Sequence, residues 1–160
     1  MRRGAILPIA ASMLGFALFA AVAASAQPNP PAISDAVVRK MLELGLQNIQ
    51  RALCDGFNQC APATPAEFEN PPITMDQARG ALFVGGRSAF ARWCGFDADK
   101  RSVLPLLRQL RQSKQYTERQ MALIAVIHGI QQSIVAEQLK AKGSCDAATR
   151  SMVDAQLPKT

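Results

Sequence analysis

The sequence of 160 residues contains only one histidine, one tryptophan and one tyrosine. With a single histidine, a metal site would need carboxylates or cysteines as its other ligands, so we expect no metal, no cofactor and no catalytic centre. With so few side chains that stack on bases, we expect no binding of nucleic acid. No glycine-rich phosphate loop lies between a strand and a helix, and no segment alternates like a strand over a useful length. The absence of strand-like alternation indicates an all-α chain.

The first 26 residues have the three parts of a secretory signal peptide. Arg2 and Arg3 form a basic start, residues 5–23 are apolar, and residues 24–26 are small. We expect cleavage near Ala26, which predicts a periplasmic or secreted protein of the bacterial envelope. An uncleaved membrane anchor is the alternative, because about twenty apolar residues are long enough to span a bilayer. Residues 27–33 contain three prolines and are predicted to form an extended leader.

Residues 34–157 are predicted to form a single domain, an antiparallel bundle of four main helices with a short C-terminal helix. Four segments carry apolar side chains at helical spacing. Their predicted bounds are 34–54, 74–94, a third helix starting near 102, and 118–142, followed by a short helix over 144–156. Thr74 with Gln77, and Thr117 with Gln120, have the capping-box pattern that starts a helix. Four prolines in residues 57–73 predict a long irregular stretch.

Four cysteines fit the predicted export, because an even number of cysteines in a secreted chain usually forms disulfides. Their number alone leaves three pairings open. Short connections make successive helices antiparallel, which places Cys54 and Cys60 at one end of the bundle and Cys94 and Cys145 at the other. We therefore predict the disulfides Cys54–Cys60 and Cys94–Cys145.

The second predicted helix contains three glycines, each of which costs roughly 1 kcal/mol relative to alanine. Ala81, Gly85 and Ala89 recur every fourth residue and form a smooth ridge. Close packing of another helix is one interpretation of the glycines. A groove floor that accepts a peptide or another ligand is the other.

His128 is the one candidate for acid–base chemistry, and it lies on the most apolar predicted helix. Ser133 is five residues away at the wrong angle for a direct hydrogen bond, so a catalytic hydroxyl would have to come from elsewhere in the fold. A buried histidine satisfied by a neighbouring amide is the alternative. Two close acidic pairs, Glu67 with Glu69 and Asp97 with Asp99, are weak signals for paired catalytic carboxylates or calcium ligands.

Two further groups are candidates for binding. Trp93 and Phe96 belong to the densest aromatic cluster of the chain, which either anchors a partner or is buried around a disulfide. Arg108 and Arg111 lie on a basic stripe of the third helix, which either faces solvent or meets an acidic partner or a membrane surface. On the same helix, Leu104, Leu107 and Leu110 are predicted to face the core. Without Arg2 and Arg3 the formal net charge of +6 falls to +4.

These features predict an exported, non-catalytic helical protein that binds another envelope protein or a peptide. In general architecture it resembles the acid-stress chaperones and the toxin-neutralising immunity proteins of the bacterial envelope, a resemblance that implies binding and carries over no residue roles. A small periplasmic hydrolase that uses His128 is the alternative. A structural component held at the membrane surface by its basic face is a third hypothesis.

Overall fold

The computed structural model describes residues 33–56 and 58–159. The chain divides into two units, residues 1–31 and 32–160, and the description below concerns the second unit. The predicted signal peptide and nearly all of the predicted leader lie outside the described residues. Ile33, the last leader residue, packs against the main core, and its carbonyl accepts a hydrogen bond from Arg79 Nε at 3.3 Å.

The described part of the chain is mostly helical, as the sequence predicts, and it contains two disulfides. Its elements in chain order are α1 (Asp35–Asn48), a 3₁₀ turn η1 (Ile49–Arg51), β1 (Leu53–Asp55), β2 (Asn58–Gln59), α2 (Pro65–Glu69), α3 (Met75–Trp93), a π-helical turn η2 (Asp99–Val103), α4 (Leu104–Ser113), α5 (Glu118–Lys140) and α6 (Ala147–Gln156).

The helix starts follow the predicted capping signals. Thr74 and Thr117 accept hydrogen bonds from the backbone N–H groups of Gln77 and Gln120, and both glutamine side chains accept from the capping residues in return. Ser34 caps α1 in the same way, accepting from the N–H of Val37. These contacts satisfy backbone donors that have no partner inside the helix.

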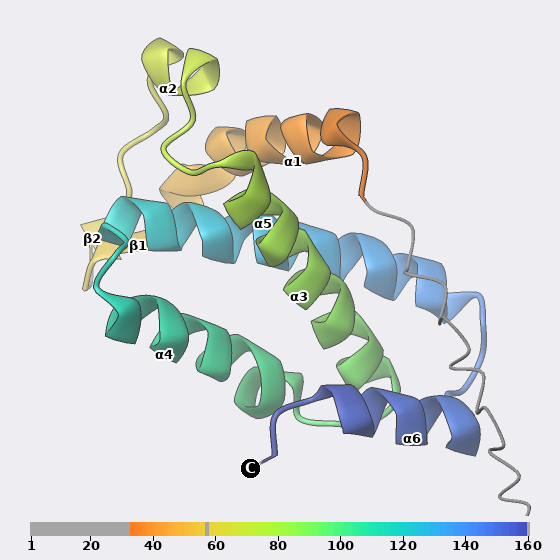
Figure 1. The fold of residues 1–160 in the computed structure, drawn as a ribbon. Coiled ribbons are helices and arrows are strands. Elements are labelled where there is room, and N and C mark those ends of the chain that lie inside the picture. Colours follow the sequence, from red (N-terminus) through yellow and green to blue (C-terminus); the bar gives the residue numbers. More distant parts are fainter. Residues whose placement is uncertain (1–32, 57, 160) are drawn as a thin grey trace, which may run out of the picture. The chain divides into compact units, whose positions relative to one another are not determined.

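The main core lies where α1, α3 and α5 meet (Figure 1). Its fully buried large side chains include Leu46, Leu82, Leu123 and Ile127. The helix α5 packs against α1, α3 and α4, which confirms its predicted central position. The helices α3 and α5 run in the same direction. Gln120, at the start of α5, donates to the carbonyl of Pro72 just before α3, and Trp93, at the end of α3, donates to the carbonyl of Gly143 just after α5.

A second, smaller core lies at the far ends of α3 and α5, where α6 packs against α3 (Figure 1). Its buried residues are Ala91, Cys94, Ala98, Val153 and Leu157. Polar contacts add to it: Arg101 Nη1 lies 2.5 Å from Asp154 Oδ1, and Arg150 donates to the carbonyl of Cys94. The small core therefore depends on ion pairs and hydrogen bonds as well as on apolar contact.

The two disulfides are Cys54–Cys60 and Cys94–Cys145, which confirms the predicted pairing. The first closes the short antiparallel hairpin of β1 and β2, at the end of α1. The second joins the end of α3 to the segment after α5. One disulfide thus belongs to each of the two cores, since Cys60 is buried in the main one and Cys94 in the second.

Several details differ from the sequence prediction. The first helix ends at Asn48, earlier than expected, and the chain continues through η1 into the hairpin. The stretch expected to be irregular contains the short helix α2. Leu110 is buried as predicted, but Leu104 is 49% exposed. The regular four-helix antiparallel bundle is not confirmed: Figure 1 shows α3 crossing α5 obliquely.

Candidate functional site

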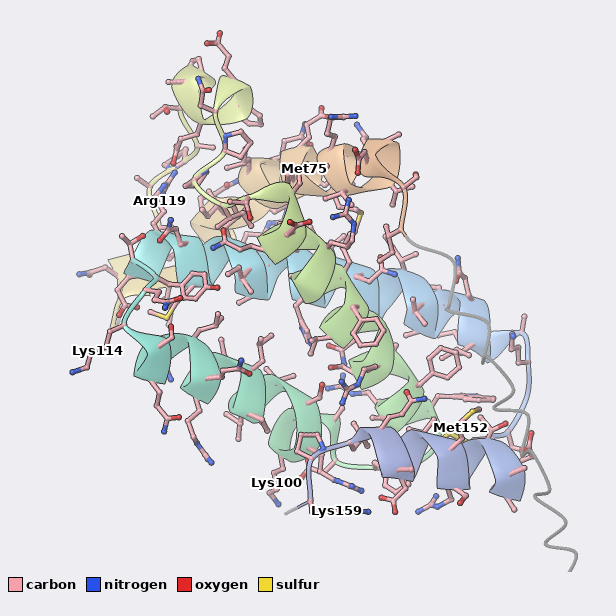
Figure 2. The ribbon with its side chains drawn as sticks, viewed as in Figure 1. Met75, Lys100, Lys114, Arg119, Met152 and Lys159 are labelled. Atoms are coloured by element: carbon pink, nitrogen blue, oxygen red, sulfur yellow. A yellow bond between two sulfur atoms is a disulfide. The ribbon has the colours of Figure 1, made fainter. Side chains whose placement is uncertain are left out.

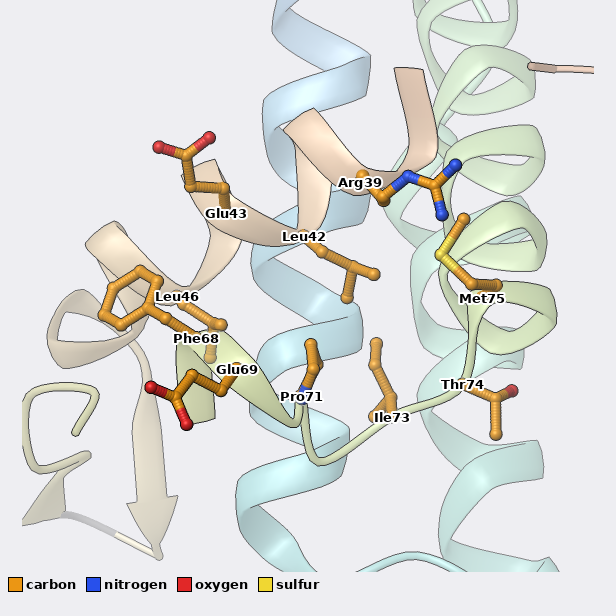
Figure 3. Close-up of a pocket in the computed structure, with 10 residues that line it drawn as sticks. All are labelled: Arg39, Leu42, Glu43, Leu46, Phe68, Glu69, Pro71, Ile73, Thr74 and Met75. Atoms are coloured by element: carbon orange, nitrogen blue, oxygen red, sulfur yellow. The ribbon is translucent and has the colours of Figure 1, made fainter. Parts of the chain in front are cut away.

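A groove of about 680 Å³ lies between α1 and the segment that contains α2 (Figure 3). This volume is within the range of ordinary ligand and peptide sites. Leu42, Leu46 and Ile73 are buried and line the groove as apolar side chains. Phe68 is 42% exposed at its edge. The groove therefore has a buried apolar floor, with Phe68 as an exposed apolar side chain at its edge.

Charged residues stand at the two ends of this groove. Glu43 and Glu69 lie on either side of Phe68, whereas Arg39 lies at the opposite end near Met75 (Figure 3). Glu43 also contacts Lys40, its Oε2 lying 3.0 Å from Lys40 Nζ. The groove thus combines an apolar centre with a charged rim, which is the usual composition of a protein interface. It is acidic at one end and basic at the other.

The wall of the groove is held in place by the first turn of α5, through Arg119 (labelled in Figure 2). Arg119 Nε and Nη2 donate to the two carboxylate oxygens of Glu67 at 2.6 and 2.8 Å, and its Nη1 donates to the carbonyl of Ala61 at 2.9 Å. Gln120 Nε2 donates to the carbonyl of Pro72 at 2.7 Å. Two neighbouring side chains therefore fix both ends of the segment that carries Phe68 and Glu69.

Electrostatics strengthen this attachment. The hydrogen bonds from Arg119 hold the pKa of Glu67 down at about 2, and the backbone N–H of Thr64 contributes in the same direction. Both partners are partly buried, with side-chain exposures of 26% for Arg119 and 19% for Glu67. A bidentate arginine–carboxylate pair in this setting is among the stronger polar contacts in proteins. The groove wall should therefore stay in place over a wide pH range.

His128 lies in a separate buried polar cluster with Ser88 and Ser102. Ser88 Oγ lies 2.8 Å from His128 Nε2, 2.7 Å from Ser102 Oγ and 3.0 Å from the carbonyl oxygen of Val84. The Ser88 hydroxyl has one proton, and all three contacts are satisfied when it donates to Val84 and accepts from Ser102 and from His128 Nε2–H. In this arrangement His128 donates to Ser88, which is the reverse of what a general base does.

Burial also limits the chemistry of this cluster. Ser88 is 0%, Ser102 4% and His128 3% exposed, so the surrounding helices cover all three side chains. Burial lowers the pKa of His128, while the charge of Asp99 acts weakly in the opposite direction. The imidazole is therefore neutral at pH 7. The contacts of Ser88 with His128 and Ser102 link α3 to α5 and η2. For a buried His128 the sequence predicted a neighbouring amide as the partner, whereas the partner is Ser88, forty positions away in the chain.

The predicted binding residues lie in different places. Trp93 and Phe96 pack against the second core, and Trp93 Nε1 donates to the carbonyl of Gly143 at 2.8 Å. Phe96 lies beneath the guanidinium groups of Arg101 and Arg150, at 5.1 and 4.6 Å from its ring centre. These contacts favour a structural role for both aromatic residues. They are not brought together with His128 or with the groove.

The basic stripe is exposed, and the glycine ridge is not. Arg108 and Arg111 project from α4 as exposed side chains. Gly85 is buried against α5, where an added Cβ would lie 2.5 Å from the carbonyl oxygen of His128. The packing interpretation therefore explains Gly85, whereas a Cβ on Gly80 or Gly86 would meet nothing within 4 Å.

Sequence reasoning did not find the groove. Phe68, Glu69 and Pro71 stand in the stretch expected to be irregular, and Arg119 gave no signal of its own. The capping pair of Thr64 and Glu67 was the available clue, because it is the same S/T-x-x-E/Q pattern that marks a helix start. It would have indicated an ordered segment between the hairpin and α3.

Within the described residues, no three histidine, cysteine, aspartate or glutamate side chains are grouped so that they could hold a metal ion. None of the helices in the same residues is both long enough and apolar enough to cross a bilayer. Comparison with protein-family models, with curated proteins and with solved structures finds no match to this chain.

Proposed function

We propose that the protein is an exported, non-catalytic binding protein that holds a segment of a partner envelope protein in the groove between α1 and α2. The observation that carries this proposal is the groove itself, with an apolar lining and a charged rim on a wall fixed by Arg119. A preformed site of this kind binds a ligand without losing conformational entropy in the ordering of its own loops. The two disulfides fit the oxidising compartment that export would provide.

The charges at the rim specify the kind of segment. An apolar side chain would pack against the exposed ring of Phe68, a lysine or arginine would meet Glu69, and a carboxylate would meet Arg39. The expected ligand is therefore a short amphipathic peptide segment with opposite charges at its two ends. Chaperones and immunity-type inhibitors both bind in this general manner, and the proposal covers either role.

Selection from a random peptide library tests the proposal and does not require the partner to be identified first. The selected peptides should share one apolar anchor with a basic residue to one side. Phe68→Ala should weaken their binding at least tenfold, because Phe68 forms the exposed edge of the groove. Phe83→Ala is the matched control, since Phe83 is a comparably exposed phenylalanine on α3, outside the groove, and its loss should leave affinity within about twofold.

Glu69→Lys refines the same experiment, because it should select peptides with an acidic residue where the original peptides have a basic one. Peptides that lose affinity with Phe83→Ala and keep it with Phe68→Ala would contradict the proposed site. A failure to select any shared pattern would argue against a peptide-binding groove altogether.

The contact between Ser88 and His128 is the one observation that favours a hydrolase as the second candidate function. The burial of both residues argues against it, because a substrate carbonyl would have to reach a fully buried hydroxyl. Hydrolysis of p-nitrophenyl acetate by the wild type, Ser88→Ala and His128→Gln distinguishes the two functions. The binding proposal expects the same background rate for all three. A wild-type turnover that both variants abolish while remaining folded would establish the hydrolase.

A further inference from the structure

The helix α4 and the loop after it carry positive charge without any negative charge. Residues 104–117 contain no aspartate and no glutamate, and they include Arg108, Arg111 and Lys114. All three basic side chains are exposed. Lys114 ends α4 and points away from the neighbouring helices (Figure 2). The outer side of α4 is therefore a local patch of positive charge.

These three charges are not used in the fold. Arg79, Arg101 and Arg119 all form ion pairs with carboxylates at 2.5 to 2.6 Å. No ion pair joins Arg108, Arg111 or Lys114 to another side chain of the described residues. The basic patch thus differs from the arginines that hold the helices together. These three basic side chains can therefore bind an anionic group outside this unit.

The other side of α4 is occupied by the core. Leu110 is buried in the main core, and Leu106 packs against it. The exposed side adds one apolar residue to the arginines, because Leu104 is 49% exposed. Leu104, Arg108 and Arg111 are spaced by four and three positions, which places them on one face of the helix. This face presents two guanidinium groups in line with an exposed leucine.

We propose that this face of α4 binds the surface of an anionic phospholipid membrane. Phosphate groups accept paired hydrogen bonds from guanidinium groups, and a dense anionic surface attracts basic residues that form no ion pair within the described fold. Leu104 would lie against the boundary between headgroups and acyl chains, as apolar side chains do at such surfaces. Binding of this kind is mainly electrostatic, weak and reversible. It leaves the groove between α1 and α2 free, so it is independent of the proposed peptide binding.

Sedimentation with lipid vesicles tests the proposal. The protein is expressed from its full sequence, including residues 1–26, and is then isolated from the cells. Vesicles of phosphatidylglycerol and phosphatidylcholine should bind the protein at low salt, and vesicles of phosphatidylcholine alone should bind it far less. Arg108→Gln with Arg111→Gln should reduce the partition coefficient by about thirtyfold, since each basic residue near an anionic surface contributes about fivefold. Salt at about 0.5 M should remove most of the wild-type binding, because it screens exposed charges.

The matched control is Lys140→Gln with Lys142→Gln, which removes the same charge from exposed positions near the end of α5. This control should keep binding within about threefold of the wild type, and both double variants should melt within a few degrees of it. An equal loss in the two double variants would show that only net charge matters and would overturn the proposal. It would also be overturned if the α4 variant bound the anionic vesicles as well as the wild type, or if the wild type did not bind them. An acidic protein would then be the partner to seek.

Discussion

The two ends of α5 are built in different ways. At its start, Arg119 and Gln120 donate to backbone carbonyls and to Glu67, next to a large core formed by three helices. At its end, five buried residues form a small core that is joined by the disulfide Cys94–Cys145 and by Arg101. The first end carries the groove. The second end carries α6, which the described structure connects chiefly through α3.

This difference shows where a covalent link contributes most. A long loop that is closed by a disulfide loses more entropy in the unfolded chain than a short one. Cys94 and Cys145 are separated by 51 positions and Cys54 and Cys60 by 6. The longer loop is closed at the end with the smaller apolar core. The groove instead lies at the end that the larger core stabilises.

The largest expected effect comes from removing the long-range disulfide. Cys94→Ser with Cys145→Ser should lower the free energy of unfolding by about 4 kcal/mol, and Cys54→Ser with Cys60→Ser by about 2 kcal/mol. Urea unfolding under non-oxidising conditions measures both, and fluorescence of Trp93 reports on the second core directly. An equal or larger loss from the hairpin disulfide would contradict the difference between the two ends.

Two adjacent glycines of α3 test the packing between the ends. Gly85→Ala should destabilise the protein by about 2 kcal/mol, because the new Cβ would press on the backbone of His128. Gly86→Ala should instead stabilise it by up to about 1 kcal/mol, since its Cβ would meet nothing and alanine favours the helix. Thermal unfolding of the two variants checks the opposite signs. If both variants were stabilised, α3 would not pack on α5 as described.

Acid should act on two contacts in separate pH ranges. The folded-state pKa of His128 is lowered, so its stabilising contribution is complete above about 6.5 and is lost as the pH falls below that value, by at most about 1.4 kcal/mol per pH unit. The pKa of Glu67 is lowered to about 2, so its contribution is complete above 4.5 and is lost as the pH falls toward 2. Unfolding measured against pH should lose its first slope in His128→Gln and part of its second in Glu67→Gln. An unchanged slope between about pH 6.5 and 5 in His128→Gln would refute the assignment of that slope.

The smallest expected effect concerns the polar contacts of the second core. Arg101→Met should cost about 1 kcal/mol, because the Arg101 side chain is only 14% exposed and its guanidinium reaches Asp154 and the carbonyl of Pro158. Lys40→Met is the matched control and should change stability by less than about 0.5 kcal/mol, since the pair of Lys40 with Glu43 is exposed. Hydrogen exchange of α6 should rise in the first variant only. Unchanged exchange there would mean that apolar contact alone holds α6.

The sequence predicted the features that depend on local signals. Capping boxes at Thr74 and Thr117 located two helix starts, and the apolar pattern of α5 indicated its central position. The disulfide pairing was predicted from helix direction, which needed only short connections. The end of the first helix was predicted wrongly, because α1 stops at Asn48 and not at residue 54.

The features that depend on distant contacts were missed. The wall of the groove is attached by Arg119, which reaches back across 52 positions to Glu67, and nothing in the local pattern of either residue indicates this pair. Ser88 and His128 meet across 40 positions for the same reason. Leu104 fits a helical apolar pattern, but α4 turns it outward, because Leu110 and Leu106 take the core-facing side. Periodicity predicts that a face exists and does not say which side the rest of the fold covers.

Photo-crosslinking in living cells tests most directly whether the groove, and not the second core, is the binding site. A p-benzoyl-phenylalanine in place of Phe68 should yield one discrete adduct with a partner protein, and the same residue in place of Phe90 should yield none. The two positions are matched, with exposures of 42% and 36%. The adduct at Phe68 should disappear with Glu43→Lys and Glu69→Lys, because these changes reverse the charge of one end of the groove. A discrete adduct at Phe90 with none at Phe68 would contradict the account and place the binding site beside α6.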